Sequence, residues 1–219
     1  MIVSHAHRFV FLKTRKTAGT SVEIALSTVC GPDDVITPVT EADERLRAEY
    51  GGRAPQHYES PPLPRKAFNH MPASMVRQLV GRGAWDGYYT FSVERNPWDA
   101  VVSLFHWRHR EDPSPPAFAD FVREPVVEEL ATKNFRGYRI NGELAVDRVL
   151  RYESLAPGVA EVWAHLGLPG APRLPRAKGG SRPRGPSYAS YYDAASRAHV
   201  AELFAPAIED FGYTFEDGG

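Results

Sequence analysis

The sequence of 219 residues has little of several features that mark large classes of proteins. Cys30 is its single cysteine, so an internal disulfide and a cysteine-rich metal site are excluded. No apolar run approaches the ~20 residues that cross a bilayer, and residues 1–7 lack the apolar core of a signal peptide. A formal net charge of −1 argues against a general nucleic-acid binder. We therefore expect a cytoplasmic protein with neither a membrane nor a nucleic-acid partner.

The composition is sufficient for one well-buried domain. Hydrophobic residues make up 42% of the chain and no break in composition divides it, so we expect a single domain over 1–219. Residues 51–66 form a Pro/Gly-rich connection, which we expect to shape a ligand pocket. Residues 172–190 are basic and contain no acidic residue, and their Gly and Pro forbid a regular helix. This second segment is either a solvated loop or a cover for an anionic ligand.

Residues 9–21 predict a strand, an anion-binding loop and a helix. The apolar stretch Phe9–Leu12 leads into Lys16-Thr17-Ala18-Gly19-Thr20-Ser21, and a helical pattern begins near Val22. Amide N–H groups at a helix N-terminus lack partners and carry the positive end of the helix dipole, so small residues there let a phosphate approach. The order differs from the Walker pattern, because the lysine precedes the glycine. A simple Ser/Thr-capped helix start is the alternative.

A second anion-binding element is predicted around Arg95. Tyr88–Val93 reads as a strand rich in aromatic and β-branched residues. Pro97 suits the first turn of a helix, which we expect to run through Trp98 to about residue 110. Arg95 at the end of the strand and Ser103 on the helix could then contact one phosphate. A salt bridge made by Arg95 is the alternative.

The two motifs, in this order, resemble the 5′-phosphosulfate loop and the 3′-phosphate element of sulfotransferases that use 3′-phosphoadenosine 5′-phosphosulfate (PAPS). Residues 147–155 resemble the family's third strand and its Tyr-Glu turn, and the segment from Tyr191 to Tyr213 resembles its C-terminal helix and ending. Over most of residues 8–215 the chain is similar to bacterial sulfotransferase family proteins related to the carbohydrate 2-O-sulfotransferases. It differs from the cytosolic aryl and steroid enzymes, whose tryptophan after the first loop is replaced by Val22. The resemblance therefore does not identify the residue that stacks on adenine.

The resemblance implies an α/β fold of three layers, similar to P-loop NTPases, with a central parallel sheet flanked by helices. It implies transfer of a sulfuryl group from PAPS to a hydroxyl or amine of a small-molecule or carbohydrate acceptor, releasing 3′,5′-adenosine bisphosphate (PAP), without a metal. Tyr152 would lie by the adenine, and the basic segment would close over the 3′-phosphate. The residues that the resemblance assigns to PAPS are Lys16, Thr17, Ala18, Gly19, Thr20, Ser21, Arg95, Ser103, Tyr152, Arg182 and Arg184.

His70 is the candidate general base. It lies in residues 68–74, just before a predicted helix over Ala73–Val80, and this segment resembles the one that presents the base in related enzymes. An acceptor hydroxyl must lose its proton as it attacks sulfur, and an imidazole that titrates near neutrality suits that step. A histidine that caps the helix is the alternative, and Glu94 or His106 would then be the base.

The other histidines are assigned weaker roles. His5 and His7 are expected in a loose terminus, and His106 with His109 share a helix face at a spacing that suits a zinc pair, but no third ligand is evident.

Two rival functions share parts of this pattern. A P-loop nucleotide kinase would have the same architecture, but it needs a lysine after the glycine of the loop. A non-catalytic PAP- or PAPS-binding protein would keep the nucleotide site alone. The presence of both Lys16 and a candidate base favours an enzyme.

Overall fold

The computed structural model describes residues 1–60, 63–175, 177 and 187–215. These residues form two compact units. The first unit contains Met1–Glu94 and Arg136–Ala177, and the second contains Arg95–Phe135 and the described residues of Lys178–Gly219. Every helix in the described part of the chain is too short or too polar to cross a lipid bilayer.

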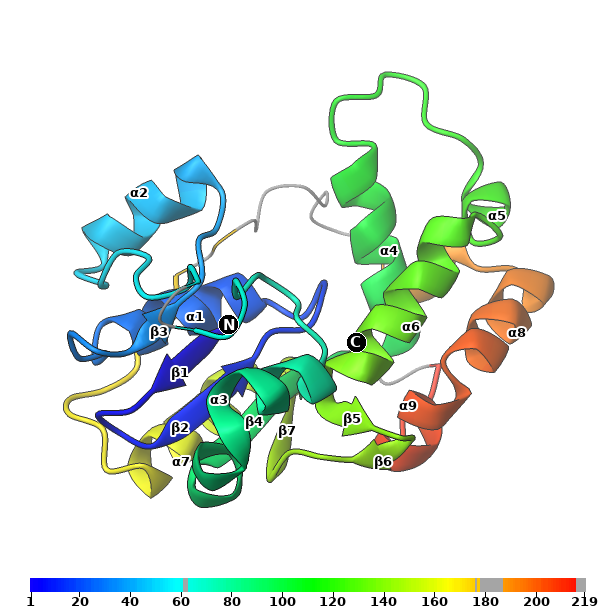
Figure 1. Cartoon of the computed structure of the whole chain (residues 1–219). Coiled ribbons are helices and arrows are strands. Elements are labelled where there is room, and N and C mark those ends of the chain that lie inside the picture. The colour runs from blue at the N-terminus through cyan, green and yellow to red at the C-terminus, as the bar shows by residue number, and fades with distance from the viewer. Residues whose placement is uncertain (61–62, 176, 178–186, 216–219) are drawn as a thin grey trace. The chain divides into compact units, whose positions relative to one another are not determined.

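A five-stranded sheet forms the centre of the first unit, with the strand order β3-β1-β2-β4-β7 (Figure 1). Its strands are β1 (Ile2–Ser4), β2 (Phe9–Leu12), β3 (Val35–Ile36), β4 (Tyr89–Glu94) and β7 (Arg148–Arg151). The strands β2, β4 and β7 run parallel to one another, whereas β1 is antiparallel to both of its neighbours. A small separate hairpin contains β5 (Arg139–Ile140) and β6 (Glu143–Leu144).

The expected α/β class is confirmed, but the expectation of a parallel sheet is wrong for its N-terminal edge. Only residues 5–8 connect β1 to β2, which is too short for a parallel crossover and allows only an antiparallel hairpin. The expected loose terminus is likewise wrong, because Met1 and β1 are buried. The ring of His7 accordingly lies in a tight turn, 3.0 Å from the carbonyl oxygen of Val29.

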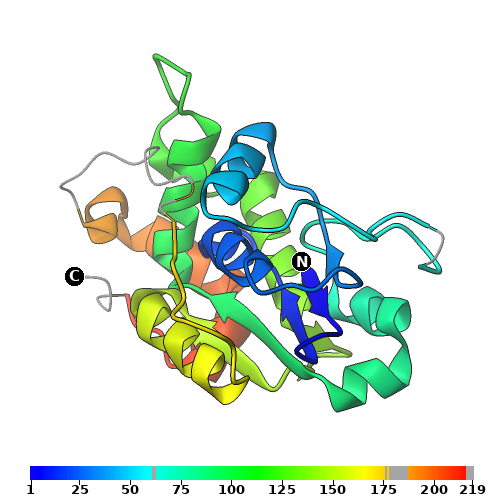
Figure 2. The same ribbon diagram turned by 90° about the vertical axis from the view of Figure 1, so that its left-hand side faces the viewer.

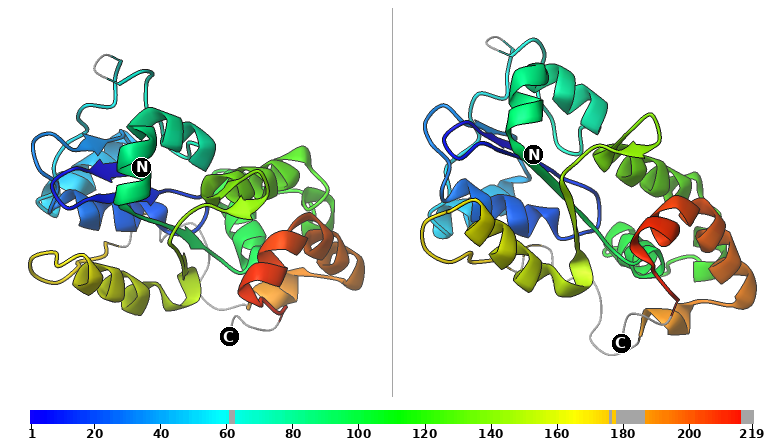
Figure 3. Two further views of the ribbon diagram at one scale, coloured as in Figure 1. Left: turned by 60° about the horizontal axis from the view of Figure 1, so that its bottom comes forward. Right: turned by 90° about the horizontal axis from the view of Figure 1, so that it is seen from below.

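Helices cover both faces of this sheet because the side chains of its strands alternate in direction. Phe9 and Phe11 belong to the core beneath α1 and α7, whereas Val10 and Leu12 belong to the core beneath α3. Figures 2 and 3 show α3 on the opposite face from α1 and α7. The helices of this unit are α1 (Gly19–Ser27), α2 (Glu41–Glu49), α3 (Ala73–Gly87) and α7 (Leu155–His165), and the 3₁₀ turn η1 is Tyr152–Ser154.

The second unit is helical and has an aromatic core of its own, which includes Trp98, Phe121 and Tyr188. Its first helix begins at Pro97 as expected, and the side chain of Asn96 accepts from the amides of the first turn. The elements are α4 (Pro97–Arg108), α5 (Phe118–Phe121), α6 (Pro125–Tyr138, whose last residues belong to the first unit), η2 (Tyr188–Tyr191), α8 (Ala194–Leu203) and α9 (Ala205–Phe211).

Candidate functional site

The loop between β2 and α1 contains two residues with a left-handed backbone. Lys16 and Ala18 adopt left-handed conformations, with φ of 63° and 57°. Helix α1 begins at Gly19, earlier than expected, and the carbonyl of Ala18 accepts from the amide of Ser21 at 2.9 Å. Ser21 thus has its amide bonded inside the turn. In the part of the chain that the structure describes, the amides of Gly19 and Thr20 have no acceptor, so both remain available as hydrogen-bond donors.

Buried threonines tie this loop to the neighbouring strand β4. The hydroxyl of Thr14 donates to the carbonyl of Val93 and lies 2.9 Å from the hydroxyl of Thr17. One residue earlier on β4, the hydroxyl of Ser92 donates to the carbonyl of Leu12 at 2.7 Å. Sequence reasoning did not single out Thr14, because only the tertiary structure shows that its hydroxyl meets a strand. These bonds hold the loop in a fixed position on a rigid sheet.

The side chain of Lys13 packs closely against Gly19 at the start of α1, and this contact predicts the effect of a substitution. A Cβ at Gly19 would lie 2.7 Å from Cγ of Lys13, whereas a Cβ at Gly83 in α3 would meet nothing within 4 Å. We expect Gly19→Ala to lower the free energy of unfolding by about 1–3 kcal/mol, because the stem of Lys13 must shift. Gly83→Ala, the matched control, should be neutral or stabilising by up to about 1 kcal/mol. Urea unfolding measures both; equal effects would show that this contact does not constrain the loop.

The side chain of Lys13 is turned into the interior of the first unit. Its Nζ donates to Oε2 of Glu23 at 2.6 Å, and both side chains are buried. Oε1 of Glu23 accepts from the amino group of Met1 at 3.0 Å and lies 3.5 Å from Nη2 of Arg47. Burial alone would raise the pKa of Glu23, but the amino group of Met1 and Lys13 lower it to about 2. The positive charge of Lys13 is therefore balanced by the carboxylate of Glu23.

His70 is held by the same segment. Its Nδ1 lies 3.1 Å from the carbonyl oxygen of Lys13. Since a carbonyl only accepts, Nδ1 must carry the proton and Nε2 keeps its lone pair. The described residues provide no hydrogen bond to Nε2. Helix α3 follows Pro72 without a side-chain cap, so His70 does not cap it.

The electrostatic environment of His70 differs from the expected one. Burial, and then the nearby charges of Lys13, the Met1 amino group and Arg15, lower its pKa to about 3. The expectation that it titrates near neutrality is thus wrong for the ligand-free protein, because a buried imidazole beside cations resists protonation. His70 is neutral throughout the physiological range, which is the form a base requires.

The lowered pKa predicts how stability depends on pH. In the unfolded state His70 binds a proton at the ordinary pKa near 6.5, whereas in the folded state it does so only near 3. The free energy of unfolding therefore falls as the pH drops below 6.5. Between pH 7.5 and 5 the free energy of unfolding of the wild type should fall by on the order of 2 kcal/mol more than that of His70→Asn. The asparagine side chain does not titrate, and asparagine tolerates a left-handed backbone. Urea unfolding at both values tests this; equal losses in the two proteins would contradict it.

The two other candidate bases have partners within their own units. Oε2 of Glu94, in the first unit, accepts from the hydroxyl of Tyr138 at 2.7 Å. In the second unit, Nε2 of His106 lies 2.8 Å from the hydroxyl of Tyr191. Nδ1 of His109 lies 3.3 Å from Asp112. In the described ranges no group of three or more His, Cys, Asp or Glu residues could hold a metal ion, so His106 and His109 have no third ligand there.

Arg95 makes the salt bridge that was its alternative interpretation. Its Nε and Nη2 lie 2.7 and 2.6 Å from Oδ2 of Asp99, and little of its side chain is exposed. Asp99 and Ser103 are four residues apart on α4 and so share one face of the helix. Arg95 is thus held by Asp99 at the beginning of the face that carries Ser103.

The other residues predicted to contact the nucleotide are Tyr152, Arg182 and Arg184. Tyr152 begins η1 directly after β7 and packs, half-buried, against the core of the first unit. Arg182 and Arg184 lie outside the described residues. Arg173 belongs to the same basic segment, residues 172–190. Its guanidinium lies 5.2 Å from the ring centre of Tyr50, in a cation–π contact.

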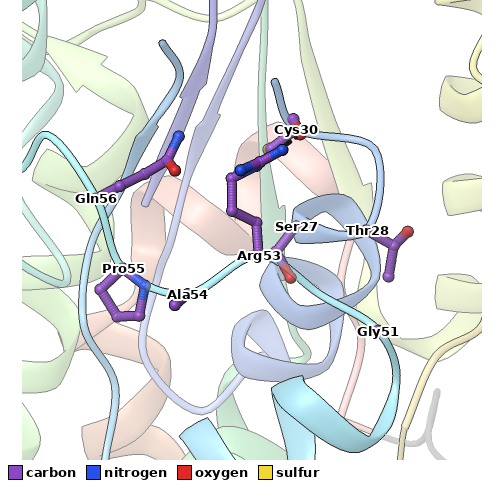
Figure 4. Close-up of a pocket in the computed structure, with 8 residues that line it drawn as sticks. All are labelled: Ser27, Thr28, Cys30, Gly51, Arg53, Ala54, Pro55 and Gln56. Atoms are coloured by element: carbon purple, nitrogen blue, oxygen red, sulfur yellow. Dashed lines mark hydrogen bonds between the residues drawn. The ribbon is translucent and has the colours of Figure 1, made fainter. Parts of the chain in front are cut away.

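A cavity of about 390 Å³ lies at the other end of α1 (Figure 4). Part of the Pro/Gly-rich connection lines it, about 13 Å along the helix from the loop. Arg53 donates to the carbonyl of Cys30 at 3.0 Å, and Gln56 donates to backbone carbonyls, so these polar side chains are engaged within the protein. An acceptor bound here would be remote from Lys16. The lining residues are Ser27, Thr28, Cys30, Gly51, Arg53, Ala54, Pro55 and Gln56.

Comparison with known proteins identifies a relative without assigning an activity. No family model matches the chain. An Archaeoglobus fulgidus protein, described as "Uncharacterized protein", is 36% identical over 101 residues, which cover 45% of this chain and 84% of the relative.

Proposed function

We propose that this chain, which belongs to the same family as the Archaeoglobus fulgidus protein, is a cytoplasmic PAPS-dependent sulfotransferase with a P-loop NTPase-like fold. It would transfer a sulfuryl group to a hydroxyl or amine of a small-molecule or carbohydrate acceptor and release PAP. One observation carries the proposal. Among the described residues, the amides of Gly19 and Thr20 in the β2-α1 loop have no acceptor, and the carbonyl of Lys13, the residue that starts this loop, accepts from Nδ1 of His70 and leaves Nε2 as a proton acceptor.

The donor would bind through the loop. The 5′-phosphosulfate would accept from the amides of Gly19 and Thr20, where the positive end of the dipole of α1 adds to the attraction. Lys16 would stabilise the charge that grows on the oxygen bridging sulfur and phosphorus. Donors placed in advance in this way contribute ~10²–10³ in rate. The remaining loop residues, Thr17, Ala18 and Ser21, would maintain the turn.

The acceptor would react on the side of His70. The acceptor oxygen forms a bond to sulfur as the bond from sulfur to the bridging oxygen breaks, PAP departs, and the acceptor proton moves to Nε2. The low pKa of His70 in the ligand-free protein reflects burial and surrounding cations. An anionic donor would offset those cations and raise the pKa of His70, so binding of PAPS would strengthen the base.

The proposal keeps the 3′-phosphate contacts that the resemblance assigns. Arg95 and Ser103 are assigned to that phosphate, and Asp99 would then share the guanidinium of Arg95 with it. Tyr152 is assigned to the adenine side, and Arg182 and Arg184 to the cover of the nucleotide. Loss of affinity for PAP, but not for AMP, in Arg95→Ala would support the first assignment.

A screen of acceptor classes with ³⁵S-labelled PAPS tests the proposed reaction. Phenols, sugars and amines are incubated with the wild type and with Lys16→Ala, and labelled products are separated from labelled donor. Transfer by the wild type alone supports a sulfotransferase. Binding of PAP without transfer to any class would favour the non-catalytic binding protein, and preferential binding of ATP would favour the nucleotide kinase.

A further inference from the structure

The carboxylate of Glu23 is a buried charge in a helix that is otherwise covered by the core. Its neighbours Val22 and Ile24 are buried apolar residues, and Glu23 itself is completely inaccessible to solvent. A buried carboxylate is costly unless it is paired and hydrogen-bonded. The groups that satisfy it are Nζ of Lys13, the amino group of Met1, the hydroxyl of Thr37 and the guanidinium of Arg47.

Two of these groups connect Glu23 to His70. Through Lys13, Glu23 fixes the residue whose carbonyl accepts from Nδ1 of His70. Through the amino group of Met1, Glu23 reaches Asn69, the residue before His70. This amino group donates to Oε1 of Glu23 at 3.0 Å and to Oδ1 of Asn69 at 3.4 Å, and Nδ2 of Asn69 donates to the carbonyl of Pro38.

His70 needs such support because its backbone is in a disfavoured conformation. Its φ of 60° is in the left-handed region, which is unfavourable for a residue with a Cβ. A residue keeps such a conformation only when its surroundings enforce it. The contacts of Lys13 and Asn69 are part of those surroundings, and both residues bind groups that Glu23 also binds or pairs with.

We infer that Glu23 is a positioning residue for His70: it fixes Lys13 and, through the amino group of Met1, Asn69, so that the imidazole keeps its proton on Nδ1 and presents Nε2. The inference rests on the proposed function for its catalytic consequence, but the tautomer is a property of the ligand-free protein. Glu23 itself touches no substrate. Its loss should therefore change the rate of the chemical step more than the binding of PAPS.

The test compares Glu23→Gln with Glu44→Gln. Glu44 is a matched control, because its carboxylate also binds Arg47 but its other contact is the amide of Val39. Long-range ¹H–¹⁵N NMR of the imidazoles at pH 7 reads the tautomer of His70. We expect the Nδ1-protonated form in the wild type and in Glu44→Gln, and a mixture of tautomers in Glu23→Gln. The kcat of Glu23→Gln should fall about 10- to 100-fold, with the KM for PAPS within a few-fold.

A second variant keeps the inference testable if Glu23→Gln does not fold. Glu23→Gln combined with Lys13→Met removes one buried charge of each sign, keeps the volume of both side chains, and leaves the carbonyl of residue 13 in place. It should fold and still show mixed tautomers. An unchanged tautomer and kcat in either folded variant would overturn the inference. A tautomer that depends on Glu23 in a protein that does not bind PAP would instead overturn the proposed function alone.

Discussion

Replacement of His70 by alanine is expected to lower the rate of sulfuryl transfer ~10²–10⁴-fold, the usual contribution of a positioned base. The reason is geometric, since Nε2 of His70 is the nitrogen left with a lone pair once Nδ1 donates to Lys13. Affinity for PAP should stay within a few-fold, because the proposed donor contacts do not include His70. Single-turnover kinetics with saturating PAPS, together with calorimetric titration of PAP, measure the two effects separately.

His57 provides a matched control for this variant. It also has a left-handed backbone, with φ of 50°, and its Nε2 lies 2.9 Å from the carbonyl oxygen of Pro32. His57→Ala therefore makes the same chemical change on the same kind of backbone, and its rate should not change. If His70→Ala loses its fold and its PAP affinity together, His70 is structural. If its rate is untouched, the base lies elsewhere, and Glu94 and His106 are the residues to test.

Lys16→Ala is expected to lower the transfer rate by ~10²–10³, as loss of a charge-stabilising donor does in other active sites. Lys16 lies half-buried in the loop, next to the start of α1, and so contributes its charge where the departing phosphate would be. Its stability should change little, because alanine and lysine bear the same cost for the left-handed backbone at this position. Rates and urea midpoints are measured on the same preparations.

Lys66→Ala is the control for the loss of a lysine. Lys66 is an exposed residue of the first unit that pairs with Glu59 at the surface. An exposed pair of this kind contributes at most about 1 kcal/mol, so this variant should keep both its rate and its stability. If Lys16→Ala transfers sulfuryl groups as fast as Lys66→Ala, Lys16 has no part in the mechanism.

The strands and motifs of the parallel part of the sheet could be predicted from local sequence. The apolar stretch Phe9–Leu12 and the β-rich run before Arg95 correspond to β2 and β4, and Pro97 marks the start of α4. These signals are local, since each depends on a few neighbouring residues. The N-terminal strand β1 could not be recognised in this way. It has three residues, and its pairing with β2 and β3 decides its conformation.

The charges around His70 could not be predicted, because they come from distant parts of the chain. Lys13 directly follows the predicted strand Phe9–Leu12, and only the fold shows that its ammonium group pairs with the buried carboxylate of Glu23. The sequence did contain a signal, namely a single glutamate among the apolar residues Val22, Ile24 and Leu26, which indicates a buried charge with a partner. The pKa of His70 differs from the expected value for the same reason, since burial and remote cations determine it.

Thermal unfolding with PAP, AMP and ATP tests the central claim most directly. A ligand that binds only the native state stabilises it by RT ln(1 + [L]/Kd), about 2.7 kcal/mol at a concentration of 100 Kd. If the site is built for a 3′-phosphorylated adenosine nucleotide, PAP should raise the Tm by several degrees, and AMP and ATP at the same concentration should raise it far less. Equal shifts from PAP and ATP would contradict the proposal that this protein is a PAPS-dependent sulfotransferase.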